Sequence, residues 1–336
     1  MKKYNVAILG ATGAVGREML KILGERKFPI NQLKLLASSK SAGQVISSDF
    51  GDVIVQQATT ESFAGIDIVL GAAQNSVAKA FAKTIVEAGA IFIDNSSAFR
   101  LDQDVPLVIP EINPEDVSLN NGIIANPNCS TIITLMAINP INRLSKIRAL
   151  YVSTYQATSG AGENGPKELI AQTKAVLNKK PIEPKVFPYQ IAFNLIPQIG
   201  DFIEIGYTSE EMKLQNEGRK ILHLSNLKVA CTCVRVPVIR SHSISVVAIT
   251  EERLTIEETK KAIQNADGCQ LVDDPSMMLY PMPLTTSDQD LVYVGRIRKD
   301  LINANGINLW CCGDQLRKGA ATNAVQIAEL CIVEHN

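Results

Sequence analysis

The sequence predicts an α/β protein in which an N-terminal Rossmann-type, doubly wound sheet is followed by an α+β domain with a mixed, largely antiparallel sheet. Residues 4–9 form a short β-rich run, residues 10–16 a glycine-rich turn and residues 17–24 a helical pattern. Similar strand and helix units follow as far as residue 94. After about residue 130 the strands become longer and alternate between apolar and polar side chains. This change of pattern indicates two domains.

The first domain is expected to span residues 1–130. Short apolar runs at residues 33–37, 66–71 and 91–94 read as buried strands, and residues 76–88 have the spacing of a helix. Strands that alternate with helices form a parallel sheet whose two faces are both covered. We therefore expect a parallel sheet between two helical layers.

The second domain is expected to span residues 131–314. Alternating stretches at residues 147–158, 229–237 and 243–250 predict its strands, with helical segments between them. The alanine-rich segment within residues 315–336 is compatible with a helix, and we expect it to pack back on the first domain and complete it.

The composition argues against several classes of partner. The 336 residues include 33 basic and 34 acidic side chains, so no net charge favours nucleic acid or an anionic membrane. No apolar stretch has membrane-spanning length and the N-terminus lacks a signal-peptide pattern, so we expect a cytoplasmic protein. The seven cysteines lack the spacing of a disulfide framework or a zinc site. We expect reduced thiols and no metal.

The turn at residues 10–16 has the position of a dinucleotide-binding loop, between a predicted strand and a predicted helix. A side chain at its glycines would keep the backbone away from a pyrophosphate, whose charge would be met by free amides and the helix dipole. An ordinary tight turn is the alternative, because the spacing is GxxGxxG rather than GxGxxG. The context favours a nucleotide site. Its residues would be Gly10, Thr12, Gly13, Ala14, Val15 and Gly16.

The end of the second predicted strand indicates which nucleotide binds. An acidic residue there would hold the ribose hydroxyls of NAD and repel a 2′-phosphate. This chain has no acid at that position and offers hydroxyls and one ammonium group instead. A solvated polar loop is the alternative. The position favours NADP, held by Ser38, Ser39, Lys40 and Ser41.

Cys129 is the candidate nucleophile. Asn126, Pro127 and Asn128 mark a turn before it, and the residues after it read as the start of a buried helix. The dipole at a helix N-terminus favours thiolate over thiol, which lowers the thiol pKa and gives a nucleophile at neutral pH. A buried structural cysteine is the alternative.

Three histidines could accept a proton in such a site. His242 is the best placed because it leads an apolar strand, whereas His223 ends a helical run and His335 lies in the C-terminal tail. A structural histidine is the alternative for His242.

Several segments, taken in order, make the chain resemble aspartate-β-semialdehyde dehydrogenase along essentially its whole length. They are GATGAVG at 10–16, SSKSAG at 38–43, DNSSAFR at 94–100, NPNCST at 126–131, STYQATSGAG at 153–162, EEMK at 210–213, CTCVRVPVIRSHS at 231–243 and RKGAATNAVQIAE at 317–329. No single motif is decisive. The ordered set is specific because both the residues and their spacing agree.

The resemblance implies a reversible reaction in which aspartate semialdehyde, phosphate and NADP⁺ give aspartyl β-phosphate and NADPH, in the biosynthesis of lysine, threonine, methionine and diaminopimelate. Cys129 would attack the carbonyl group, His242 would take the hydroxyl proton as hydride leaves, and phosphate would cleave the thioester. The family's glutamine beside the thiol corresponds to Gln156. The second domain would carry catalysis and dimerisation, and a homodimer or a tetramer is implied.

The resemblance also implies the binding residues. Arg235 would hold the substrate carboxylate, which its forked guanidinium suits, and Glu210 the substrate ammonium. Arg100 and Lys213 would hold the phosphate, although Glu210 and Lys213 alone would read as an ordinary i,i+3 helical pair. Further substrate contacts are implied at Asn128, Ser159 and Gly160. Further cofactor contacts are implied at Asn95, Gln315 and Asn323.

Two departures from the family pattern concern the cofactor. Residues 73–76 read AQNS where a Gly-Gly-Ser turn is common, and Lys40 replaces a common arginine.

Two other functions are alternatives. N-acetyl-γ-glutamyl-phosphate reductase shares the architecture and the thioester chemistry, but an Asn-Pro-Gly-Cys type of turn would be expected where this chain has Asn128. A nucleotide-binding paralogue without catalysis would be expected to lose the cysteine or the histidine.

Overall fold

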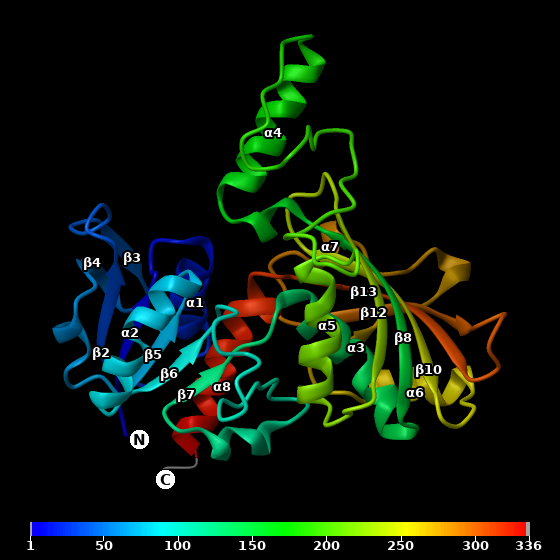
Figure 1. Ribbon diagram of the computed structural model, residues 1–336, viewed down its shortest axis with the longest axis horizontal. Helices are drawn as coiled ribbons and strands as arrows, with labels where there is room; N and C mark the ends of the chain where they lie inside the picture. Colours follow the sequence, from blue (N-terminus) through cyan, green and yellow to red (C-terminus); the bar gives the residue numbers. More distant parts are fainter. Residues whose placement is uncertain (1, 334–336) are drawn as a thin grey trace. The chain divides into compact units, whose positions relative to one another are not determined.

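The computed structural model (Figure 1) describes residues 2–333 of the chain. His335 and the end of the predicted C-terminal helix lie outside the described residues. None of the helices in the described part is long and apolar enough to cross a membrane.

The chain forms two compact units. The first runs to Asn128 and resumes at Ala320, and the second comprises residues 129–319. We expected the boundaries after residue 130 and before residue 315, so both differ slightly from the prediction. The chain passes from the first unit to the second immediately before the candidate nucleophile.

The sheet of the first unit has the strand order β3-β4-β2-β1-β5-β6-β7. The strands are β1 Tyr4–Leu9, β2 Ile30–Ala37, β3 Val45–Ser48, β4 Gly51–Gln57, β5 Ile68–Gly71, β6 Ile91–Asp94 and β7 Ile123–Ala125. Neighbouring strands are parallel except β3 and β4, which form an antiparallel hairpin. The predicted doubly wound sheet is confirmed. Its antiparallel edge was not predicted, and Gly51, with a φ of +91°, permits the tight turn that forms it.

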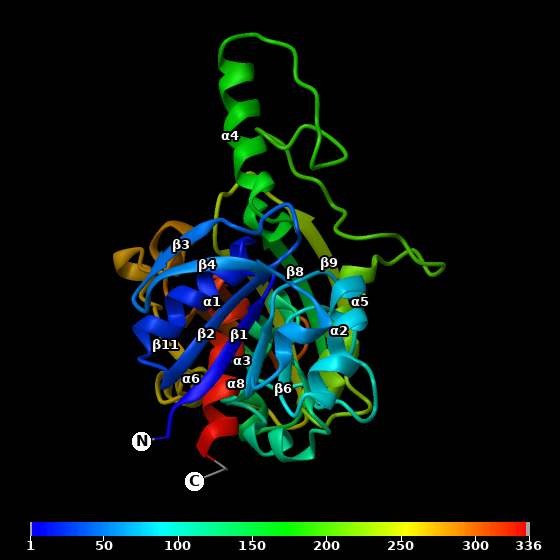
Figure 2. The ribbon, with the colours of Figure 1, turned by 90° about the vertical axis from the view of Figure 1, so that its left-hand side faces the viewer.

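Helices pack on both faces of this sheet (Figure 2). The helices are α1 Ala14–Glu25, α2 Asn75–Glu87 and α8 Thr322–Val333. Successive residues of β1 point to opposite faces. Val6 and Ile8 belong to one buried cluster with residues of α1 and α8, whereas Ala7 and Leu9 belong to another with residues of α2. The strands are therefore apolar on both sides, as a buried parallel sheet requires.

The sheet of the second unit has the strand order β11-β12-β13-β10-β8-β9. The strands are β8 Ile147–Gln156, β9 Lys228–Arg235, β10 His242–Thr250, β11 Cys269–Leu271, β12 Val292–Lys299 and β13 Gly306–Gly313. The pairs β8–β9 and β11–β12 are parallel, and the other three pairs are antiparallel. The predicted mixed, largely antiparallel sheet is confirmed.

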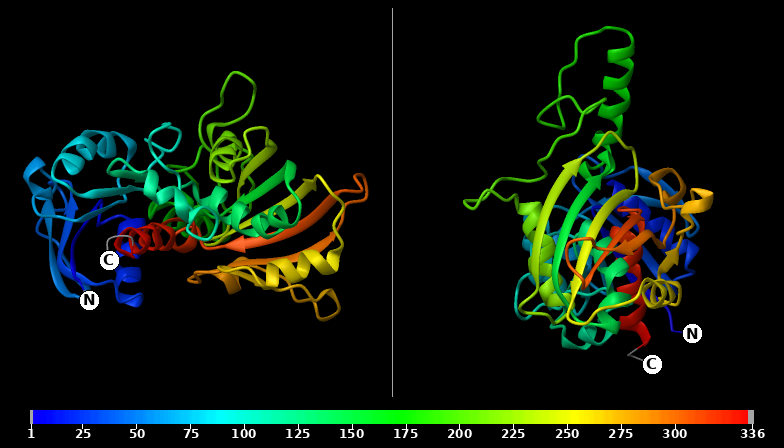
Figure 3. Two further views of the ribbon diagram at one scale, coloured as in Figure 1. Left: turned by 90° about the horizontal axis from the view of Figure 1, so that it is seen from below. Right: turned by 90° about the vertical axis from the view of Figure 1, so that its right-hand side faces the viewer.

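One face of this second sheet is covered by helices and the other is open. The helices of the unit are α3 Cys129–Leu144, α4 Asn164–Leu177, α5 Ser209–Ile221, α6 Ile256–Gln264 and α7 Pro283–Thr286. Figure 3 shows α3, α5 and α6 along one side of the curved sheet, whereas α4 stands away from it. The other face has a hollow of about 510 Å³ lined by Tyr151, Ser153, Ser245 and Val247 among others.

Candidate active site

Cys129 is the first residue of α3, as the sequence predicted. The chain leaves β7 at Ala125, and Asn126, Pro127 and Asn128 carry it to the start of the helix. The first turn of α3 contains no acidic side chain. The sulfur therefore lies where the amide groups of a helix N-terminus stabilise negative charge. The Cys129 side chain is partly exposed, in contrast to the buried Cys231, Cys233, Cys311, Cys312 and Cys331.

His242 lies beside this sulfur. Its Nε2 atom is 3.5 Å from Cys129 Sγ, and its ring is fully buried at the start of β10. The backbone N–H of Ala157 donates to His242 Nδ1 at 3.1 Å. Because Nδ1 accepts this hydrogen bond, the neutral ring carries its proton on Nε2. The imidazole thus presents an N–H group toward the reactive thiol.

The pKa of His242 is strongly lowered, to about 3. Burial is the main cause, and the positive charge of Arg235 adds to it, while Glu210 acts in the opposite direction. The ring is therefore neutral at pH 7. A neutral Nε2–H group suits hydrogen bonding to an oxygen that gains negative charge.

Gln156, Glu210 and Lys213 form a polar cluster beside the histidine. Gln156, the last residue of β8, has its Nε2 atom 3.5 Å from His242 Nε2 and donates to Glu210 Oε1 at 3.3 Å. On the first turn of α5, Glu210 Oε2 accepts from Lys213 Nζ at 2.7 Å. Glu210 and Lys213 thus form the i,i+3 helical pair expected from the sequence. Glu210 links Lys213 to the residues around the sulfur.

Arg235 ends β9 and is buried, with 6% of its surface exposed. Its Nη1 atom donates to the carbonyl oxygen of Ala157 at 2.6 Å. Burial lowers the pKa of Arg235, and the negative charges of Cys129 and Glu210 counteract this. A Cβ atom on Gly160 would lie 2.8 Å from Arg235 Nη1 and 3.2 Å from His242 Cε1, so a side chain there would displace the guanidinium.

Gln315 and Ser159 also lie in the second unit. Gln315 Nε2 donates to Ser159 Oγ, and Gln315 Oε1 accepts from the backbone N–H of Ser241 at 2.9 Å. The structure therefore connects Gln315, predicted to contact the cofactor, with Ser159, predicted to contact the substrate.

The glycine turn of the first unit packs closely against neighbouring backbone at both of its ends. Gly10 has a φ of +91°, and a Cβ there would lie 2.7 Å from the carbonyl oxygen of Ala72. A Cβ on Gly16 would overlap the carbonyl oxygen of Gly10. Helix α1 begins at Ala14 with neither a side-chain cap nor an acid in its first turn, an arrangement that suits an anion at its N-terminus. Thr12, Gly13, Ala14 and Val15 are exposed or partly exposed.

The loop after β2 has the polar surface expected of it. Ser38, Ser39 and Lys40 are exposed and Ser41 is partly exposed. Between the end of β2 and the start of β3 the chain has no acidic residue. The loop can therefore accept a phosphate without charge repulsion.

The remaining predicted residues of the first unit form a buried polar network. Arg100 donates from Nε to the carbonyl oxygen of Asn126 at 2.9 Å and from Nη2 to that of Asn95 at 2.8 Å. Asn126 Nδ2 donates to Asn95 Oδ1 at 2.6 Å. Asn323 Nδ2 uses both hydrogens, toward Asn126 Oδ1 at 2.7 Å and the carbonyl oxygen of Val108 at 2.9 Å. Asn95 and Asn323 thus fix the turn that leads to α3.

Two positions of the second unit were missed by the sequence analysis. Ala157 acts through its backbone N–H and carbonyl groups, which leave no side-chain signal in the sequence. Gly319 lies against the nucleophile, because a Cβ there would be 3.1 Å from Cys129 Cβ. The glycine in the RKGAATN segment was the only available clue to it.

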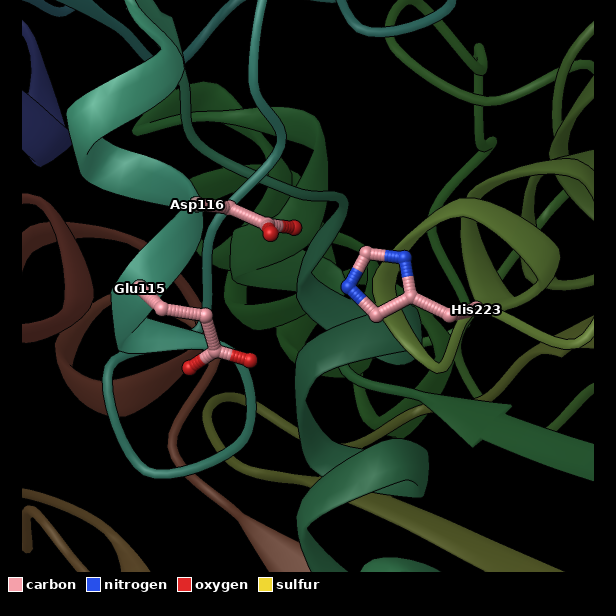
Figure 4. A group of neighbouring side chains, drawn as sticks. All are labelled: Glu115, Asp116 and His223. Carbon is pink, nitrogen blue, oxygen red and sulfur yellow. The ribbon is translucent and has the colours of Figure 1, made fainter.

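Figure 4 shows three further titratable residues, Glu115, Asp116 and His223. Glu115 and Asp116 lie on the short helix η2 (Pro114–Leu119) of the first unit, where Asp116 Oδ2 accepts from Asn113 Nδ2 at 2.7 Å. His223 follows α5 in the second unit with a φ of +53°, a conformation that ends helices. We assign no metal site to these residues.

A glycine-turn nucleotide fold in one unit and a thiol–imidazole pair in the other define a semialdehyde dehydrogenase. Two family models match the chain, "Semialdehyde dehydrogenase, NAD binding domain" over residues 5–120 and "Semialdehyde dehydrogenase, dimerisation domain" over residues 138–318. The chain belongs to the aspartate-semialdehyde dehydrogenase family, whose members are phosphorylating aldehyde dehydrogenases. It is therefore an oxidoreductase that uses a nicotinamide cofactor.

Three relatives illustrate the similarity. Aspartate-semialdehyde dehydrogenase of Bacillus subtilis is 51% identical over 97% of this chain and 96% of its own. A crystal structure of aspartate semialdehyde dehydrogenase II from Vibrio cholerae, complexed with ASA, is 44% identical with a TM-score of 0.97 and covers 100% of both chains. A structure of the Candida albicans enzyme with NADP is 25% identical with a TM-score of 0.76, over 98% of both chains. The similarity sets aside the two alternative functions considered above.

The lowered pKa of His242 predicts a specific pH dependence of stability. The folded ring titrates near pH 3 and the unfolded ring near 6.5, so below pH 6.5 the unfolded chain binds the extra proton. The free energy of unfolding should therefore fall by roughly 1 to 2 kcal/mol between pH 6.5 and 5 from this residue alone. In denaturant titrations over this pH range, the free energy of unfolding of His242→Asn should fall by roughly 1 to 2 kcal/mol less than that of the original protein. Equal pH dependence of the original protein and His242→Asn would contradict the account.

Proposed function

We propose that the chain catalyses the reversible, NADP-dependent reductive dephosphorylation of L-aspartyl β-phosphate to L-aspartate 4-semialdehyde through a thioester on Cys129. The observation that carries the proposal is the 3.5 Å approach of His242 Nε2 to Cys129 Sγ at the start of α3. Membership of the family supports the substrate and the phosphorylating reaction. By the same reasoning the pathway would be the biosynthesis of lysine, threonine, methionine and diaminopimelate.

In the reductive direction the Cys129 thiolate attacks the acyl phosphate carbon, the carbon–oxygen bond to phosphate breaks, and a thioester remains. A bound nicotinamide supplies the hydride. The carbonyl oxygen then carries negative charge, which the Nε2–H group of His242 stabilises by a hydrogen bond. When the carbonyl re-forms, the carbon–sulfur bond breaks and the thiolate and the aldehyde are released.

The tautomer of His242 changes the role expected for it. The resemblance to the family implies a base that takes the hydroxyl proton. Because the Ala157 N–H occupies Nδ1, Nε2 already carries a proton and the resting ring acts as a donor. Thiolate attack on an aldehyde gives an alkoxide directly, so the oxidative direction needs such a donor rather than a base.

Arg235 and its neighbours would hold the substrate. The forked guanidinium of Arg235 suits the α-carboxylate, and Glu210, with Gln156 beside it, suits the α-ammonium. Lys213, Arg100, Asn128, Ser159 and Gly160 are proposed to complete the contacts with substrate and phosphate. Gln156 is proposed to orient the thioester oxygen.

The first unit would hold NADP. The uncapped N-terminus of α1 after the glycine turn suits the pyrophosphate, and the loop after β2 offers hydroxyls and an ammonium group to a 2′-phosphate. Further cofactor contacts are proposed for Asn95, Asn323 and Gln315. The first two would act through the turn at residues 126–128, which they hold in place.

The second unit would form a homodimer, with a tetramer as a further assembly. The matching family model is a dimerisation domain. The open face of the second sheet carries Tyr151 with 58% of its surface exposed, beside the hollow described above. Such a face is suited to packing against a second copy.

The reaction itself can be tested with purified protein. NADP⁺ should be reduced only when both aspartate semialdehyde and phosphate, or arsenate in its place, are present. Cys129→Ala should lower the rate by at least about a thousandfold, because no nucleophile remains. The matched control is Cys269→Ala, another partly exposed thiol in the same unit. Full activity of Cys129→Ala, or a preference for glyceraldehyde phosphate, would refute the proposal.

The cofactor preference depends on Lys40. Lys40→Ala should raise the KM for NADP⁺ by about five- to tenfold, because an ammonium–phosphate contact is lost, and leave kinetics with NAD⁺ unchanged. Lys83→Ala serves as the control, since Lys83 lies on α2 of the same unit with 85% of its side chain exposed. Equal effects of Lys40→Ala on both nucleotides would remove Lys40 from a 2′-phosphate site.

A further inference from the structure

Phe187 lies against the guanidinium of Arg235. The Cζ atom of Arg235 is 6.0 Å above the centre of the Phe187 ring, and only 7% of the Phe187 surface is exposed. We propose that Phe187 is a positioning residue that sets the guanidinium of Arg235 for the α-carboxylate of the substrate. This inference rests on the carboxylate-binding role proposed for Arg235.

The Phe187 ring belongs to residues 164–196, an excursion of the chain between β8 and β9 that contributes no strand to the sheet. The excursion rises as α4 and returns as an irregular segment, as Figure 1 shows. Glu168 on α4 accepts backbone N–H groups of the returning segment through its carboxylate. These donors are Lys185 at 3.1 Å, Val186 at 2.6 Å and Phe187 at 3.5 Å.

A second side chain of α4, one turn further on, holds the next part of the returning segment. Gln172 Oε1 accepts from the backbone N–H groups of Ile191 at 2.8 Å and Ala192 at 3.2 Å. Gln172 Nε2 also donates to Glu168 Oε1 at 2.9 Å. The returning segment is therefore fixed to α4 on both sides of Phe187.

The excursion also pairs with β9 at Arg235, the residue whose guanidinium lies against Phe187. Ile196 and Arg235 exchange both backbone hydrogen bonds, from Arg235 N–H at 2.8 Å and from Ile196 N–H at 3.0 Å. Ile196 shares a buried apolar cluster with Leu169, Phe187 and Ile191. The backbone of Arg235 and its side chain are thus both held by one segment.

A ring contact suits a buried cation that must still bind a substrate. Burial removes water from Arg235, and the negative face of an aromatic ring replaces part of that solvation. The contact uses none of the N–H groups of the guanidinium. Nη1 is already directed to the Ala157 carbonyl, so the ring limits rotation of the fork without occupying a donor.

The test compares two substrates on four variants. Phe187→Leu keeps an apolar side chain and removes the ring, and Tyr189→Leu is the matched control, because Tyr189 lies in the same segment with 65% of its surface exposed. Single-turnover and steady-state rates are measured with aspartate semialdehyde and with 3-aminopropanal, which is the same aldehyde without the carboxylate. Arg235→Lys and the double variant Phe187→Leu/Arg235→Lys are measured in parallel.

For Phe187→Leu we expect kcat/KM with aspartate semialdehyde to fall about five- to thirtyfold, mainly through KM, with little change for 3-aminopropanal. Tyr189→Leu should match the original protein with both substrates. The double variant should lose less than the product of the two single losses, because both changes disturb one interaction.

The outcomes separate the inference from the proposed function. If Arg235→Lys affects both aldehydes equally, Arg235 does not bind the carboxylate and its proposed role fails. If Arg235→Lys discriminates between the aldehydes while Phe187→Leu does not, or if the two losses multiply, Phe187 is only part of the apolar cluster and the positioning role is overturned.

Discussion

The backbone of Ala157 holds two side chains of the second unit in place, those of His242 and Arg235. Its N–H donates to Nδ1 of His242 and its carbonyl oxygen accepts from Nη1 of Arg235. The N–H belongs to the peptide group shared with Gln156 and the carbonyl to the peptide group shared with Thr158. Each of these groups is planar, so Ala157 holds both partners without a rotatable side chain. The tautomer of the histidine and the direction of the guanidinium therefore depend on one backbone position at the end of β8.

That position depends in turn on strand register. β8 and β9 run parallel with Gln156 opposite Arg235, and β10 runs antiparallel to β8 with Ser243 opposite Tyr155. His242 precedes Ser243, so it lies at the same end of these strands as Gln156 and Arg235. A slip of one residue would turn these side chains to the opposite face, so the apolar packing that sets the register also sets the geometry of the site.

Much of this fold could be predicted because its signals are local. Residues 4–9 and 91–94 are β1 and β6, since each is a short apolar run followed by a turn. Cys129 begins a helix because a proline-containing turn precedes an apolar run. The β3–β4 hairpin lacked such a signal, since it lies at an edge with Val45 and Ile54 mostly exposed. Half-exposed strands have no continuous apolar pattern to read.

The site was predictable in its side chains and not in its backbone. Cys129, His242 and Gln156 have reactive or polar groups that a sequence displays, and the structure brings them together. Ala157 acts through its backbone N–H and carbonyl groups, and Gly319 through the absence of a side chain, so only three-dimensional packing reveals them. The proton position on His242 follows from such a backbone contact, which has no signal in the sequence.

The central claim, a covalent thioester on Cys129, is tested most directly by trapping it. The protein is incubated with aspartyl β-phosphate in the absence of a nicotinamide nucleotide, quenched in acid and digested for peptide mass mapping. The account predicts an aspartyl group on the peptide containing Cys129 that hydroxylamine removes, with release of phosphate. An adduct on another of the seven cysteines, or release of phosphate without any adduct, would contradict it.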